Sequence, residues 1–520
     1  MMSAAALLLA VGPSGVEGQL LRTQSEVSEF TEFTSYDNMM TYLQAVQASS
    51  TEMRLGTYGE TREGRELPYA IFSRPAVTQP WEAWALGKPI LVLAAGVHGP
   101  ERTLRESVLI MTRDLATPGT PMNRVLDDLT ILVVPQINPD GFSWPERPIR
   151  GNLWGLDLNR DYMKLEQPEI QAYVQDILLR WAPHLYIDGH NGGAPPYNIA
   201  YQCPSHAAPD QRITQLCHDR IFPAIDRKLE AEGYSAFFYD VGRTETRWVT
   251  GGTDPRIGRN YGGFANTVGI LFESPPGMQT LADGVRSGVL AYEAVVEWAR
   301  ENPGLLMETV RMARVEAVAL GSDPEGQVPI EVEYAPADTT VTYQLVPRGP
   351  GAADQEIRTI VSDSLMIRPV ATLTRDRPWA YVVPRDAESA IELLRRHSIA
   401  VERLQEDTEV QVQVYRIADI TYERAYNHAA STRVHVHDVV TETVTLPRGS
   451  YIVRTGQMQG RVVAHLLEAE TTDGVVYWNR MDAWLPKPEV AAFRRGEGEP
   501  PHFPIVKIMT PTPLSTRLLN

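Results

Sequence analysis

The sequence predicts an α/β fold, in which a doubly wound, mixed and largely parallel sheet carries helices on both faces and is followed by a β-rich C-terminal domain. Short apolar runs bounded by Gly and Pro alternate with helical patterns up to about residue 300, which is typical of strands buried in a parallel sheet. Several of these runs end at a histidine or a glutamate. Further along the chain, apolar and polar residues alternate with period two, which indicates a β-rich domain.

The length and composition indicate a globular protein of two or three domains. The chain has 520 residues, of which 43% are hydrophobic and 22% are charged. Its formal net charge of -17 argues against nucleic acid or an anionic membrane surface as the main partner. The two cysteines, Cys203 and Cys217, exclude a disulfide scaffold and a cysteine-rich zinc cluster. They leave open one bridge in an oxidising compartment or two buried thiols.

Residues 1–18 form an apolar stretch of about the length of a signal-peptide core, followed by small residues. We therefore expect export to the periplasm or the extracellular space. No Lys or Arg precedes the stretch, so a wrongly assigned start codon and a disordered apolar tail stay open as alternatives. No later run is long enough to cross a bilayer, and no membrane span is expected.

The first elements are predicted from capping residues and apolar runs. Ser35 is suited to the N-cap of a helix over SYDNMMTYLQAVQAS, and TREGRELPYAIFS predicts a turn followed by a strand. The apolar run that starts at Ile90 predicts a buried strand that leads into His98. Pro100 is suited to the first position of the helix that follows.

Further strands and helices alternate after this point. DLTILVV predicts a second buried strand, QPEIQAYVQDILLRWAP a helix, HLYIDGH a third strand ending at His190, and NTVGILFE a fourth ending at Glu273. Open α/β sheets bind their ligands at the carboxyl ends of the strands. We therefore expect His98, His190 and Glu273 to lie along one functional rim.

His98 and Glu101 are three residues apart at the first strand-to-helix junction, and zinc accepts both a histidine nitrogen and a carboxylate oxygen. The spacing alone is a weak signal, because the same pair recurs at His465 and Glu468. The motifs in the neighbouring sequence distinguish the pair that is expected to bind metal from the pair that is not.

Five segments, GVHGPE, NPDGF, IRGNLWGLDLNRD, DGH and ILFES, occur in this order. Together they resemble the zinc metallocarboxypeptidase family of carboxypeptidase A type, from about Tyr36 to Arg300. The resemblance implies a carboxypeptidase-like fold and hydrolysis of the C-terminal peptide bond of peptides or proteins through a zinc-activated water. It implies one zinc ion per chain, held by His98, Glu101 and His190, an open set of ligands that is typical of catalytic zinc.

The resemblance also implies roles for other residues. Asp157 would orient the first zinc histidine, and Glu273 would be the general base. Arg150 would stabilise the oxyanion, with Arg147 close enough to compete. Asn159 and Arg160 would clamp the terminal carboxylate of the substrate.

The loop before Glu273 departs from the digestive enzymes of this family. Its only tyrosine, Tyr261, is placed in the role of the tyrosine that covers the substrate. Arg256 or Arg259 would favour acidic departing side chains, but either could equally be solvated or paired with Asp254.

The division of the chain follows from these patterns. We predict a catalytic domain at residues 19–300, a helix and linker at 301–328 and a β-rich domain at 329–520, an arrangement that resembles large bacterial members of the family. Two other functions stay open: a zinc amidase for non-standard bonds, such as a peptidoglycan stem peptide or a γ-glutamyl bond, and a silent peptide-binding relative.

Overall fold

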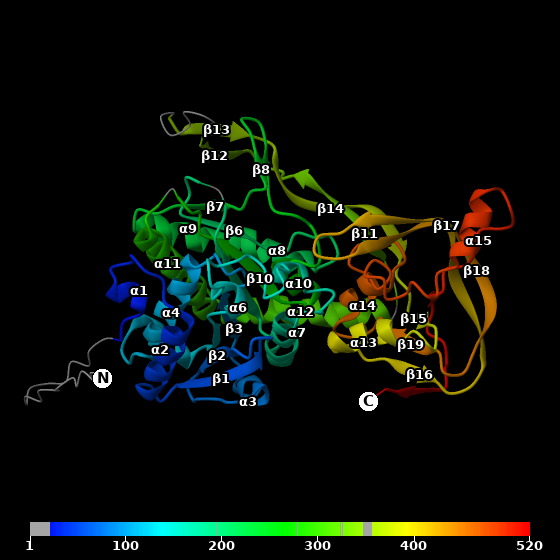
Figure 1. The fold of residues 1–520 in the computed structure, drawn as a ribbon, viewed down its shortest axis with the longest axis horizontal. Helices are drawn as coiled ribbons and strands as arrows, with labels where there is room; N and C mark the ends of the chain where they lie inside the picture. The colour runs from blue at the N-terminus through cyan, green and yellow to red at the C-terminus, as the bar shows by residue number, and fades with distance from the viewer. Residues whose placement is uncertain are drawn as a thin grey trace, which may run out of the picture.

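The computed structural model describes residues 21–193, 195–277, 279–322, 324, 326–346 and 356–519. The predicted signal peptide or apolar tail at residues 1–18 lies outside these ranges. Figure 1 shows an α/β part on the left and a β-rich part on the right of the view. The predicted fold class is confirmed by this architecture.

An eight-stranded sheet forms the centre of the α/β part, in the order β1-β2-β4-β3-β5-β10-β6-β7. Strands β4, β3, β5 and β10 run parallel to one another. On one side of them β2 pairs antiparallel with β4 and β1 antiparallel with β2, and on the other side β6 pairs antiparallel with β10. The strands are β1 (Met53–Glu60), β2 (Glu66–Phe72), β3 (Ile90–Ala95), β4 (Thr130–Val134), β5 (Leu185–His190), β6 (Ile199–Gln202), β7 (Ala236–Phe238) and β10 (Val268–Glu273).

Helices cover both faces of this sheet (Figure 1). They are α1 (Gln24–Val27), α2 (Tyr36–Ala48), α3 (Pro80–Leu86), α4 (Thr103–Ala116), α5 (Pro121–Arg124), α6 (Pro139–Phe142), α7 (Pro168–Ala172), α8 (Gln211–Leu216), α9 (Phe222–Ala231), α10 (Gly258–Phe264), α11 (Leu281–Glu301) and α12 (Pro303–Ser322). Along β3, Leu91 and Leu93 belong to the core that also contains residues of α2, α4 and α11, whereas Ile90 and Val92 belong to the core of the opposite face. Burial on both faces explains why this strand is apolar without interruption.

The expected elements before His190 differ from the structure at two places. Helix α2 starts after Ser35, whose side chain accepts a hydrogen bond from the Asn38 backbone, as predicted. The helix after His98 starts at Thr103 and leaves Pro100 in the preceding turn. Strand β1 was not expected, because this edge strand is half exposed and lacks an apolar run.

The β-rich part contains three smaller sheets. The strands of these sheets and the helices among them are β8 (Gly242–Arg243) and β9 (Trp248–Val249), which come from the α/β part, and β11 (Gln327–Pro336), β12 (Val341–Leu345), β13 (Arg358–Ser362), β14 (Leu365–Asp376), β15 (Ala380–Val383), α13 (Glu388–Arg396), β16 (Glu402–Leu404), β17 (Thr408–Arg424), β18 (Ala430–Leu446), β19 (Tyr451–Arg454), α14 (Gly460–Leu467), α15 (Lys487–Arg494), β20 (Val506–Ile508) and β21 (Thr516–Leu518). The largest sheet has seven strands in the order β18-β17-β20-β15-β19-β16-β21, and its pairs are antiparallel.

The two parts share a sheet and a hydrophobic core. Strands β8 and β9 precede β10 in sequence, yet β9 pairs with β14 of the C-terminal part, with Trp248 opposite Leu365. One continuous core joins residues of β3 and α10 to residues of β15 and α13. The C-terminal part is therefore packed directly onto the α/β part.

Two further features bear on the expectations from sequence. Within the described ranges, no helix combines the length and the apolar character needed to cross a membrane. Cys203 and Cys217 form a disulfide, with their Cα atoms 6.4 Å apart.

Candidate active site

The carboxyl ends of β3, β5 and β10 form one rim of the central sheet. His190 and Glu273 are the last residues of β5 and β10, and they are register partners across these two parallel strands. His98 follows β3 in a tight turn. A Cβ atom at Gly99 in this turn would lie 2.3 Å from the carbonyl carbon of Gly141, so only glycine permits the close packing on α6.

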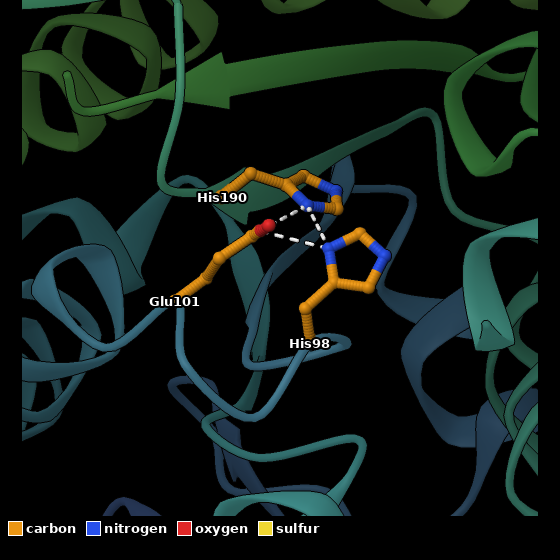
Figure 2. Close-up of side chains that lie close together, drawn as sticks. All are labelled: His98, Glu101 and His190. Atoms are coloured by element: carbon orange, nitrogen blue, oxygen red, sulfur yellow. Dashed lines mark hydrogen bonds and ion pairs between the residues drawn. The ribbon is translucent and has the colours of Figure 1, made fainter. Parts of the chain in front are cut away.

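Three side chains from this rim converge on one point. The Nδ1 atoms of His98 and His190 lie 2.9 Å and 2.8 Å from the Glu101 Oε2 atom, and 3.2 Å from each other. Figure 2 shows the three side chains pointing toward a common centre. Both histidines are almost fully buried. Within the described residues, this is the group of His, Cys, Asp and Glu ligand atoms that could hold a metal ion.

A carboxylate lies at the outer nitrogen of each histidine. The Nε2 atom of His98 is 2.9 Å from Asp157 Oδ1, and the Nε2 atom of His190 is 2.9 Å from Asp188 Oδ2. Burial lowers the pKa of each imidazole, yet the carboxylates around it raise that pKa above its usual value. Outer carboxylates of this kind hold metal-binding histidines in one tautomer, with the inner nitrogen free to bind.

The donor set fits a zinc ion. Two imidazole nitrogens and one carboxylate oxygen, already gathered within 4.8 Å of one another, are the ligands that zinc takes at catalytic sites with three protein ligands. The excess of carboxylates in and behind this cluster favours a bound cation. His98, Glu101 and His190 are thus the residues that would hold it.

Glu273 lies at the same rim and is 7% exposed. Its Oε2 atom is buried without a hydrogen-bond partner among the described residues, and a Cβ atom at Gly192 would lie only 2.7 Å from it. Burial raises the pKa of Glu273 to about 8, and the charge of Glu101 adds to the rise. A cation at the three ligands would act in the opposite direction and favour the carboxylate form.

Arg150 connects the ligand Glu101 to the outer carboxylate Asp157. Its Nη1 atom donates to Glu101 Oε1 at 2.8 Å, and its Nε atom donates to Asp157 Oδ2 at 3.0 Å. The side chain is 47% exposed, so the guanidinium lies at the open side of the rim. Of the two arginines weighed from sequence, Arg150 rather than Arg147 makes these contacts.

Asn159 and Arg160 lie on a single turn that begins at Asp157. The Asp157 carboxylate caps this turn by accepting from the Asn159 backbone at 2.9 Å, while the same Oδ1 atom contacts His98. The Asn159 Oδ1 atom accepts from the Gly258 backbone at 2.8 Å, which ties the turn to α10. Arg160 is half-buried, and its Nη1 atom donates to the Asn159 carbonyl at 2.8 Å.

Residues 39–249 match the sequence profile of the family described as zinc carboxypeptidase. This part of the chain belongs to the zinc carboxypeptidase family. The resemblance predicted from the five motifs is confirmed by this match, and the match covers the residues from α2 to β9, with His98, Glu101 and His190 among them.

Several carboxypeptidases are similar to longer stretches of the chain. Carboxypeptidase 2 of Trichophyton tonsurans is 24% identical over 442 residues, which cover 80% of this chain and 78% of that protein. Carboxypeptidase 2 of Trichophyton rubrum is 24% identical over 467 residues, or 85% of this chain and 82% of that protein. These alignments are long enough to extend into the β-rich part.

Solved structures are also similar to part of the chain. A metallo-carboxypeptidase from Pseudomonas aeruginosa has a TM-score of 0.41 and 20% identity, and the match covers 52% of this chain and 70% of that chain. A metallo-carboxypeptidase from Burkholderia cenocepacia has a TM-score of 0.39 and 18% identity, covering 51% of this chain and 69% of that chain.

The structure corrects the prediction that Tyr261 contacts substrate. Tyr261 is fully buried on α10, and its hydroxyl lies 3.0 Å from His397 Nδ1 of the β-rich part. Its ring packs beside that of Tyr162. Because it contacts side chains of both parts and is fully buried, Tyr261 joins the two parts and has no surface open to a substrate.

The two arginines considered for selecting the departing side chain are both buried. Arg256 pairs with the buried Asp473 of the β-rich part at 3.0 Å, so it serves the contact between the two parts. The Arg259 Nη2 atom donates to the Gly252 carbonyl at 2.7 Å. Asp254, the partner considered from sequence, lies 3.4 Å from Arg256.

Sequence reasoning missed Asp188, the carboxylate behind His190. The available signal was the D-x-H spacing within one strand, because residues two apart in a strand point to the same side of the sheet. An aspartate at this position is thus directed along the same face as His190, a candidate metal ligand.

The second pair with the spacing of His98 and Glu101 is structural. The buried His465 Nε2 atom lies 2.7 Å from the Thr472 carbonyl. Glu468 accepts from the Tyr381 hydroxyl at 2.6 Å and lies 2.9 Å from Lys507 Nζ. Both side chains are therefore occupied by contacts inside the β-rich part.

Substituting His465 is expected to leave the zinc content unchanged. We expect His465→Ala protein to retain about one zinc per chain, whereas His98→Ala protein should lose it, because only His98 belongs to the converging set of ligands. Metal analysis of the two purified variants, each checked for folding by circular dichroism, measures this difference. Zinc loss in the His465 variant alone would place the metal in the β-rich part.

Proposed function

We propose that the protein is a zinc-dependent carboxypeptidase that hydrolyses the C-terminal peptide bond of peptides or proteins. The observation that carries this proposal is the single turn from Asp157 to Arg160. Asp157 contacts the metal-site histidine His98, and Arg160 lies three residues later on the same short element. This turn therefore holds the Arg160 guanidinium, the proposed binding group for a terminal carboxylate, at a fixed distance from the metal site.

The residues at the rim have complementary roles in this reaction. When bound, a zinc ion would supply a Lewis acid that polarises the scissile carbonyl and acidifies a water molecule. Glu273 takes a proton from the attacking water and delivers it to the departing amine. Arg150 donates to the negative charge that develops on the carbonyl oxygen, from its position beside Glu101.

Asn159 and Arg160 recognise the end of the substrate. A guanidinium fork binds a carboxylate through two parallel hydrogen bonds, which a lysine cannot reproduce. No carboxylate of the described residues lies within ion-pair distance of Arg160. The guanidinium is therefore available for the carboxylate of a substrate.

Export from the cytoplasm is part of the proposal. Disulfides persist in oxidising compartments and are rare in the cytosol. The bond between Cys203 and Cys217 supports a periplasmic or extracellular enzyme, in agreement with the apolar stretch at residues 1–18.

The enzyme is expected to require a free carboxylate at the end of its substrate. A hydrogen bond to a charged group contributes about 1.5–3 kcal/mol net. Amidating the peptide, or introducing Arg160→Ala, should therefore lower kcat/KM by about 10- to 100-fold or more. Both changes remove the same contact, so their combined effect should be smaller than the sum of the two.

The measurement compares one peptide and its C-terminal amide with wild-type and Arg160→Ala enzyme. Arg160→Lys should rescue poorly, because a point charge lacks the fork. Equal rates of wild-type enzyme on the acid and the amide would contradict a carboxypeptidase and favour an endopeptidase or an amidase for non-standard bonds.

A further inference from the structure

The long hairpin β17–β18 extends from the β-rich part toward the α/β part (Figure 1). Residues 425–429 form its tip. The Asn427 carbonyl at this tip accepts a hydrogen bond from Lys164 Nζ at 3.2 Å. Lys164 is 3% exposed and lies shortly after Arg160 in the sequence. This buried contact therefore anchors the tip next to the proposed carboxylate site.

Tyr426 at the same tip lies beside Arg160. The centre of its ring lies 5.8 Å from the Arg160 Cζ atom. Arg160 is half-buried, whereas Tyr426 itself is 55% exposed.

Arg160 has few other contacts that would hold its side chain in place. Its hydrogen bond goes to the carbonyl of the neighbouring Asn159, and it forms no ion pair with a described carboxylate. A long side chain with one anchor loses rotamer freedom when a ligand fixes it, which weakens binding. An aromatic face against the guanidinium reduces this loss and also limits the access of water to the ion pair that substrate would form.

We propose that Tyr426 is a positioning residue that holds the Arg160 guanidinium for the terminal carboxylate of the substrate. The β-rich part thereby completes the substrate site of the carboxypeptidase domain. This inference depends on the proposed function, because it assigns to Tyr426 an effect on substrates that end in a free carboxylate. The ring acts through its face, so the hydroxyl contributes little.

Tyr422 provides a matched control on the same hairpin. It is also 55% exposed, and a cation, Lys487 Nζ, lies 5.8 Å from the centre of its ring. It lies at the end of β17 just before the tip, but its cationic neighbour belongs to α15 and not to the turn that carries Arg160. Its removal therefore reproduces the loss of an exposed aromatic ring and of a cation–π contact, without changing the surroundings of Arg160.

The test measures KM and kcat for a peptide with a free C-terminus and for its amide. We expect Tyr426→Ala to raise KM for the free peptide about 3- to 30-fold with little change in kcat, because the contact is the same in the ground state and the transition state. Tyr426→Phe should retain nearly wild-type KM, and Tyr422→Ala should do the same. The rate on the amide should not respond to any of the three substitutions.

A double-mutant cycle with Arg160→Ala identifies the route of the effect. In an Arg160→Ala background, Tyr426→Ala should cause no further rise in KM, since the residue through which the ring acts is gone. Equal KM values for Tyr426→Ala and Tyr422→Ala would overturn the inference, and so would an undiminished Tyr426→Ala effect without Arg160. With either of these results, a wild-type enzyme that prefers the free peptide over the amide would leave the proposed function intact. A wild-type enzyme without that preference would overturn the inference and the proposed function together.

Discussion

Removing zinc with a chelator is expected to abolish peptide hydrolysis, and adding zinc back is expected to restore it. His98, Glu101 and His190 are aligned by the ends of β3 and β5, and Asp157 and Asp188 hold the two imidazoles from behind. Such an arrangement leaves a coordination position open for chemistry and binds zinc reversibly. The purified protein should contain about one zinc per chain, as measured by elemental analysis before and after dialysis against the chelator.

A second measurement distinguishes the loss of metal from unfolding of the protein. Thermal unfolding should show that the chelated protein is still folded, because the packed sheet and both cores do not depend on the three ligands. Full hydrolytic activity in a folded protein without metal would contradict the assignment of a zinc site at this rim.

Replacing Glu273 with glutamine is expected to lower kcat by about 10²–10⁴-fold while zinc stays bound. Proton transfer by a positioned side chain typically contributes a factor of this size, and glutamine preserves the shape of the side chain but cannot take up the proton. Glu273 is register partner of His190 but is not one of the three converging ligands. The change should therefore appear in kcat and leave the metal content and KM nearly unchanged.

Glu169 on α7 offers a matched control for this substitution. It is also a buried glutamate, and burial raises its pKa as well, but it lies outside the rim. Glu169→Gln should keep kcat near the wild-type value in the same assay. A Glu273→Gln enzyme with near wild-type kcat would mean that another group is the base.

Much of the α/β part was predictable from local patterns. The apolar runs indicated β3, β4, β5 and β10, because strands of a parallel sheet are buried on both faces and tolerate few polar residues. The carboxyl ends of parallel strands lie at one edge, so a histidine or glutamate at the end of each run was expected at one rim. The converging atoms of His98, Glu101 and His190 agree with that expectation.

Tyr261 shows where local pattern fails. A tyrosine in the loop region before Glu273 is compatible with either a surface role or a core role, and the sequence nearby does not distinguish them. The hydroxyl is bonded to His397, which is far away in the chain. Only the packing of the β-rich part onto α10 decided that this side chain is buried.

The sequence by itself determined the α/β class, the strands of the parallel sheet and the identity of the residues at its rim, because strand burial and side-chain chemistry act over a few neighbouring residues. Only the tertiary structure decided which residues from the C-terminal part join them. Tyr426 meets Arg160, and Asp473 meets Arg256, across long separations in sequence. Such contacts depend on the docking of two parts through a shared sheet and core, and no local period in the chain encodes the partner of a distant side chain.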